Sequence, residues 1–176
     1  MTNIIKEIIK NRPLIIDGAM GTQLQLASID EKCWKGIDGA DLEGCNELLN
    51  ATAPDVIRRV YSNYANAGAD LITTNTFGSM SWVLDEYDIG NRAYELTFEG
   101  AKLAREVCDD FSTLEKPRFV LGSIGPGTKL PSLGHIHYDE MYEGYKEVAR
   151  GLVDGGCDIF LLETCQDPLQ IKAALH

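Results

Sequence analysis

The sequence predicts an α/β fold built on a parallel sheet, and two observations support this. Four short apolar runs each end in glycine or polar residues, and amphipathic helical patterns separate them. The runs are 14–17, 72–77, 119–126 and 159–164. Short apolar runs suit strands covered on both faces, and their alternation with helices predicts parallel strands joined by right-handed crossovers. A doubly wound open sheet and part of an eight-stranded barrel both satisfy this pattern.

The spacing of the runs limits how much of a barrel is present. Eight units at this spacing would need far more chain than the 176 residues here. The sequence therefore contains about four βα units, or half a barrel, within one predicted domain that spans residues 1–176.

The predicted helices follow the 3.6-residue period. A stripe of isoleucines in 3–11 predicts a short helix that covers the amino ends of the strands. Thr52 and Asp55 have the spacing of a capping box, so a helix is expected over 52–67, ending at Gly68. The other expected helices are 20–27, 89–109, 141–152 and one from Asp167 to His176. Residues 28–50, between the predicted helices 20–27 and 52–67, are expected to form a long connection. Long connections in compact domains are often functional.

Asp17 ends the first apolar run and is the first candidate site residue. Ligands bind at the carboxyl ends of strands in both open α/β sheets and α/β barrels. Gly18 and Gly21 allow a sharp turn that leaves amide N–H groups free for a carboxylate or phosphate. Glu163 holds the corresponding position in the fourth run. The alternative is a plain strand-to-helix turn in which Asp17 acts only as a cap.

Composition excludes several functional classes. The formal net charge of −11 argues against nucleic acid and anionic membranes as partners. No segment approaches the roughly 20 apolar residues needed to span a bilayer, and the amino terminus lacks a signal-peptide pattern. Five cysteines at irregular spacing predict free thiols in a reducing, cytoplasmic setting.

Three motifs, in order, carry a family resemblance. They are Asp17–Thr22, Asp41–Leu49 and Ala67–Phe77, and Leu121–Pro126 and Leu161–Thr164 continue the match. Together they closely resemble the homocysteine S-methyltransferase module of cobalamin-dependent methionine synthase. The resemblance implies a (β/α)8 TIM barrel, of which this chain is the amino-terminal half.

The resemblance also implies an activity. In this family the module binds homocysteine by its amino acid head and ligates the sulfur to zinc, which yields the thiolate that accepts a methyl group. Methylcobalamin donates the methyl group and methyltetrahydrofolate recharges it, so folate- and cobalamin-binding modules are the implied partners. The backbone at Gly18 and Ala19 is expected to receive the substrate carboxylate. Asp17 and Glu163 are expected to bind the ammonium group. Thr74 and Asn75 are expected to add hydrogen bonds.

The zinc ligands depart from the family pattern. The family uses three cysteines, one after an asparagine and two adjacent to each other, and this sequence has no adjacent pair. The ligands are therefore expected beyond His176, with no catalytic residue, zinc or cobalamin held by this chain alone. A substitute zinc site made from Cys45, His135, His137 and Cys165 is an alternative. The favoured alternative is that Cys165 packs as a small apolar side chain, that Cys45 belongs to the family-like segment 41–49, and that Trp34 and Trp82 are packing residues.

Three readings of the function stay open. The first is the amino-terminal half of a homocysteine S-methyltransferase, and the second is a non-catalytic binding or assembly module derived from the half barrel. The third is a different (β/α) enzyme with similar strand-end turns. Under the half-barrel readings, unpaired strand edges predict pairing with a missing half or self-association.

Overall fold

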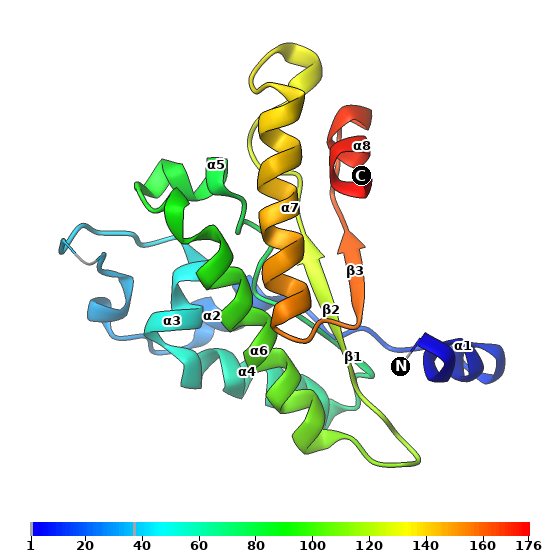
Figure 1. The fold of residues 1–176 in the computed structure, drawn as a ribbon. Coiled ribbons are helices and arrows are strands. Elements are labelled where there is room, and N and C mark those ends of the chain that lie inside the picture. Colours follow the sequence, from blue (N-terminus) through cyan, green and yellow to red (C-terminus); the bar gives the residue numbers. More distant parts are fainter. Residues whose placement is uncertain (1, 37) are drawn as a thin grey trace.

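The computed structural model describes residues 2–36 and 38–176, and a parallel sheet lies at its centre (Figure 1). The strands β1 (Leu71–Thr73), β2 (Phe119–Ile124) and β3 (Ile159–Leu162) lie side by side in that order. Ile16 adds a parallel bridge to Leu71 on the other side of β1. Each segment thus lies beside its predecessor without the reversal of a doubly wound sheet. This order is that of a partial barrel.

The first apolar run does not form the expected buried strand. It makes a single bridge to β1, and Ile15 and Ile16 are 54% and 50% exposed. Within the described residues the run has a neighbour on one side only, so its second edge and much of its surface stay open. The second run is also shorter than expected, because pairing in β1 ends at Thr73 and the next residues turn.

Four helices cover one face of the sheet in chain order (Figure 1). They are α4 (Pro54–Ala67), α6 (Ala93–Phe111), α7 (Tyr138–Asp154) and α8 (Pro168–Leu175), and each packs against the next. The remaining α-helices are α1 (Thr2–Asn11), α2 (Met20–Leu26), α3 (Leu49–Thr52) and α5 (Ser81–Leu84). The predicted helices are confirmed, with small shifts at their ends. Among the described residues, no helix is long and apolar enough to cross a membrane.

Helix ends confirm two predictions and correct one. Asp167 caps α8 in a capping box with Gln170, and Gly68 ends α4 with a φ of 108°. The capping box expected at Thr52 is wrong. Thr52 closes α3 and its Oγ1 donates to the carbonyls of Cys33 and Leu48, while Ala53 precedes Pro54 at the start of α4. Proline at the first position starts this helix without a side-chain cap.

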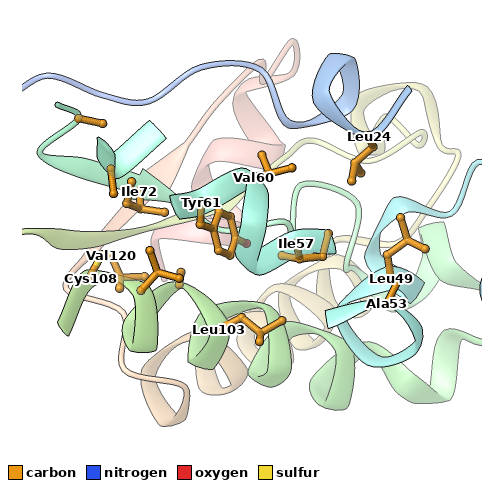
Figure 2. Packing of buried hydrophobic residues seen from close by; sticks show 14 residues of the cluster. Leu24, Leu49, Ala53, Ile57, Val60, Tyr61, Ile72, Leu103, Cys108 and Val120 are labelled. Atoms are coloured by element: carbon orange, nitrogen blue, oxygen red, sulfur yellow. The ribbon is translucent and has the colours of Figure 1, made fainter. Parts of the chain in front are cut away.

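The largest core cluster lies between the helices and the sheet. Figure 2 shows Ile57 and Tyr61 of α4 facing Leu103 of α6, with Ile72 and Val120 of the strands beside them. Tyr61, Ile57 and both strand residues are fully buried. Burial of each such side chain contributes about 1.5–3 kcal/mol. This packing holds β1 and β2, and therefore the residues that follow them, in place.

The other face of the sheet is covered at its amino end by α1. Ile5 and Ile8 of this helix pack against the cluster that contains Leu71, Phe119 and Ile159, the first residues of the three strands. The isoleucine stripe therefore has the expected role. Trp82 is buried and Trp34 is partly buried against a core cluster, as their predicted packing role requires.

Candidate substrate-binding site

A cavity of about 470 Å³ opens at the carboxyl ends of the strands. All six residues that the sequence proposed for substrate binding line it: Asp17, Gly18, Ala19, Thr74, Asn75 and Glu163. The remaining lining residues are Ile16, Met20, Gly21, Asn46, Glu47, Thr73, Phe77, Ser123 and Leu161. The cavity thus joins the first apolar run, the turns after β1 and β3, and the Asn46–Leu48 3₁₀ helix.

Asp17 is held at the rim by the end of β1. Its Oδ2 accepts a hydrogen bond from the Thr73 amide at 2.9 Å, and Oδ1 accepts one from the Thr73 hydroxyl at 2.6 Å. Burial raises the pKa of Asp17 to about 6, the charge of Glu163 adds to the rise, and the bonds from Thr73 oppose it. Asp17 and Glu163 therefore face the same cavity, as predicted, although β1 and β2 lie between their segments.

Glu163 directly follows β3. Its amide donates to the carbonyl of Ile124, and its Oε1 accepts a 2.6 Å hydrogen bond from Ser123 Oγ. The next residue, Thr164, has a φ of 62°, which is costly for a β-branched side chain. The backbone thus turns sharply just after Glu163 and leaves this carboxylate at the cavity wall.

Glycine at the first position of the turn after Asp17 allows the Tyr64 side chain to approach closely. A Cβ on Gly18 would lie 2.8 Å from atoms of the Tyr64 side chain, whose hydroxyl donates to the Ala19 carbonyl. Within the described part of the chain, no backbone carbonyl accepts from the amides of Gly18 or Ala19. These two N–H groups at the cavity wall are available to a ligand.

Thr74 and Asn75 are tied into the protein. The Thr74 hydroxyl accepts from the Ser123 amide and shares a hydrogen bond with Thr76. Both hydrogens of Asn75 Nδ2 are used, by the Asn46 carbonyl at 2.7 Å and Asn50 Oδ1 at 2.9 Å. These bonds fix the turn after β1, so both residues support the wall, and direct bonds from them to a ligand stay a prediction.

Four polar lining residues escaped the sequence-based site prediction. Thr73 and Ser123 lie at the polar ends of apolar runs, a signal that could have found them. Asn46 and Glu47 come from the long connection, where no periodic pattern indicates which way a side chain points. Their contribution depends on how 46–50 packs against the turn after β1.

The described residues do not fit a zinc ion. Outside residues 1 and 37, no group of three or more His, Cys, Asp or Glu side chains is placed to hold a metal. Cys45 is 1% exposed in an apolar cluster, and burial raises its pKa to about 11. His135 Nδ1 accepts from the Leu130 amide. The substitute site made from Cys45, His135, His137 and Cys165 is therefore not assembled, since zinc needs about three converging ligands.

Sheet order, covering helices and cavity define the class of this protein: a (β/α) barrel segment with a ligand cavity at the carboxyl ends of its strands. The model of the homocysteine S-methyltransferase family matches residues 14–176. The chain belongs to the homocysteine S-methyltransferase family.

Individual relatives agree with this assignment. Methionine synthases from Mycobacterium tuberculosis and Mycobacterium leprae are each 48% identical to the chain over 169 residues. The match covers 96% of this chain and 14% of each relative. The metallated and oxidised forms of the Escherichia coli homocysteine methyltransferase MmuM superpose with TM-scores of 0.75 and 0.74 at 19% identity. They cover 96% of this chain and 60% and 59% of the MmuM chains, and at this identity they support the fold alone.

Proposed function

We propose that the cavity binds the amino acid head of homocysteine, as part of an enzyme of the methionine synthase type that transfers a methyl group to its sulfur. One observation carries the proposal. Asp17 and Glu163 both line a cavity whose described lining residues include no lysine, arginine or histidine, and the charge of Glu163 is felt at Asp17. Such a cavity complements a ligand that brings its own positive charge.

Each end of the amino acid has a partner in this arrangement. The ammonium group lies between Asp17 and Glu163, and the carboxylate accepts from the free amides of Gly18 and Ala19. The side chain runs along the apolar wall of Met20, Phe77 and Leu161. Binding at both ends orients the sulfur, which is the contribution of this part of the protein to the reaction.

Zinc supplies the thiolate in this family, and the residues described here do not fit it. We therefore propose that the metal ligands, and the folate- and cobalamin-binding modules, belong to other parts of a longer protein. The length of the mycobacterial relatives supports this proposal. The open edges beside Ile16 and β3 then pair with further barrel strands, or with a second copy when these residues stand alone. The five free cysteines support a reducing cytoplasm as the setting.

Calorimetry of homocysteine binding tests the head-group assignment. Glu163→Gln removes a charge and keeps the shape, so we expect at least about tenfold weaker binding, or ~1.4 kcal/mol. The matched control Glu115→Gln, at an exposed site before β2, should bind like the wild type. 4-Mercaptobutanoate lacks the ammonium group and should not distinguish the Glu163 variant from the wild type. Equal homocysteine affinity in wild-type and Glu163→Gln protein would contradict the assignment.

Metal analysis tests whether this chain builds its own zinc site, and methyl-transfer assays of longer forms separate the enzyme from the binding-module alternative. Residues 1–176 alone should retain no zinc after dialysis and should show no methyl transfer from methylcobalamin, because a free thiol with a pKa near 8.5 is only a few per cent ionised at pH 7. One equivalent of retained zinc with turnover would show that this chain builds its own metal site. Homocysteine binding that supports no turnover in any longer form of the protein would favour the binding module.

A further inference from the structure

Glu47 is a third carboxyl group in the cavity, and neither the sequence motifs nor the proposed function assigns it a role. It lies on the 3₁₀ helix Asn46–Leu48 and is 9% exposed. Its Oε1 accepts a 2.7 Å hydrogen bond from the Gly78 amide, which links it to the turn after β1. A Cβ on Gly78 would lie 3.0 Å from Oε1, so glycine permits this close approach.

The charges of the cavity leave Glu47 without a cation. In the proposed binding mode, the ammonium group of the ligand lies between Asp17 and Glu163. Both of these residues are more exposed than Glu47. Burial raises the pKa of Glu47, and hydrogen bonds from the Gly78 amide and from its own backbone amide oppose this rise. A carboxyl group that is buried without a cation retains its proton more readily than it holds a charge.

Among the described residues, the ionisable neighbours of Glu47 supply no unpaired cation. Cys45 and Tyr87 both have raised pKa values, chiefly through burial, and so are neutral near pH 7. Arg92, which lies near Cys45, is paired with Glu95 at 2.7 Å. The carboxyl groups of Asp17 and Glu163 line the same cavity and offer Glu47 no positive charge.

Glu47 shares its cavity with the groups that would receive the substrate carboxylate. Gly18, Ala19, Asn46 and Glu47 all line it. A Cβ on Gly21 would lie 4.0 Å from Asn46 Nδ2, so the residue next to Glu47 borders the turn that starts at Gly18. A protonated carboxyl group in this cavity adds a hydrogen-bond donor to the two free amides.

We propose that Glu47 acts as a neutral carboxylic acid that donates its O–H to the carboxylate of the bound amino acid. The inference rests on the proposed function and deepens it, because it makes Glu47 a residue that selects an amino acid over the corresponding amine. No bond is made or broken, and the proton stays on Glu47. As pH rises, loss of this proton replaces a donor with a charge that repels the ligand carboxylate.

Two variants and two ligands test this role by calorimetry. The wild type should prefer homocysteine to 3-aminopropane-1-thiol, which lacks the carboxylate, by at least about tenfold. Glu47→Leu should reduce that preference, and the amides of Gly18 and Ala19 account for what remains. Glu47→Gln keeps an acceptor for Gly78 and supplies an N–H donor, so it should retain the preference for homocysteine. Because glutamine has no proton to lose, the variant should also lack the decrease in homocysteine affinity that deprotonation of Glu47 causes in the wild type at high pH. If Glu47→Gln lowers the affinity for homocysteine as much as Glu163→Gln does, the inference is overturned. This outcome can be measured even if the leucine variant does not fold.

Carboxyl carbon-13 NMR without ligand gives an independent readout. The Glu47 resonance, identified by its absence in Glu47→Gln, should titrate above the ordinary range of glutamate, and a midpoint within or below that range would overturn the inference. Failure of the wild type to bind homocysteine would overturn the proposed function and the donor role together. Binding by a protein in which Glu47 is ionised would overturn the donor role alone.

Discussion

β2 and the run 14–17 are apolar segments of the same kind, yet they have different structures. All six residues of β2 are buried, and the strand pairs with β1 and β3. Ile15 and Ile16 are half exposed, and their run makes one bridge. The difference shows that an apolar run becomes a buried strand through its neighbours, because only paired strands on both sides and a covering helix remove its surface from water.

Side chains hold 14–17 where a ladder is missing. Asp70 Oδ2 accepts from the Ile15 amide at 2.9 Å, and its carboxylate forms two hydrogen bonds with Arg12. The central strands repeat this arrangement, since Asp158 accepts from the Val120 amide and from Arg105, both at 2.8 Å. In each case an aspartate just before a strand fastens the preceding one.

Matched isoleucine truncations should show the largest difference between the two regions. Ile124→Ala in β2 removes a side chain that is 2% exposed and should lower the free energy of unfolding by about 2–5 kcal/mol. Ile16→Ala should cost less than about 1 kcal/mol, because that side chain is half exposed. Urea unfolding measures both, and equal costs would contradict the comparison.

Asp17 should make stability depend on pH at the open end of the sheet. Its folded-state pKa of about 6 lies above the ordinary 3.8, so the folded protein binds more protons between these values. Its contribution is therefore favourable at low pH and is lost as pH rises from about 4 to 6, by on the order of 2–3 kcal/mol. Urea unfolding across this range should show the decline in wild type and a smaller one in Asp17→Asn. An unchanged slope in the variant would remove Asp17 as the cause.

The two aspartate clamps should differ in strength. Asp70→Asn should destabilise by about 1–2 kcal/mol, because Arg12 is 40% exposed and water replaces part of the loss. Asp158→Asn should cost more, since Arg105 is 21% exposed and the central strands depend on it. Although burial opposes ionisation of Asp70, its hydrogen bonds from Arg12 and Ile15 lower its pKa, so this clamp is lost only below about pH 4. Thermal unfolding of both variants at pH 7 shows which substitution costs more stability. A larger loss of stability in Asp70→Asn than in Asp158→Asn would contradict this prediction.

Amide hydrogen exchange should resolve the smallest effect. The amides of Ile15 and Asp17 are hydrogen-bonded, to Asp70 and to the Leu71 carbonyl, but lie in an exposed segment. They should exchange at least about tenfold faster than the β2 amides through local opening. Equal protection would mean that 14–17 opens only with the whole sheet, as a central strand does.

The sequence by itself determined the alternation of strands and helices, the parallel sheet and the lining residues at the ends of the apolar runs. These features are local, because periodicity, glycine and proline act within a few residues. Asp17 and Glu163 were found this way, since a polar residue at the carboxyl end of a parallel strand faces the binding edge whatever surrounds it.

Only the tertiary structure decided the exposure of Ile16, the end of α3 at Thr52 and the place of Glu47 in the cavity. Each depends on contacts between segments far apart in the chain, such as the bond from Gly78 to Glu47 or from Thr52 to Cys33. Burial and pairing are properties of the assembled neighbours, so no local pattern of residues carries them.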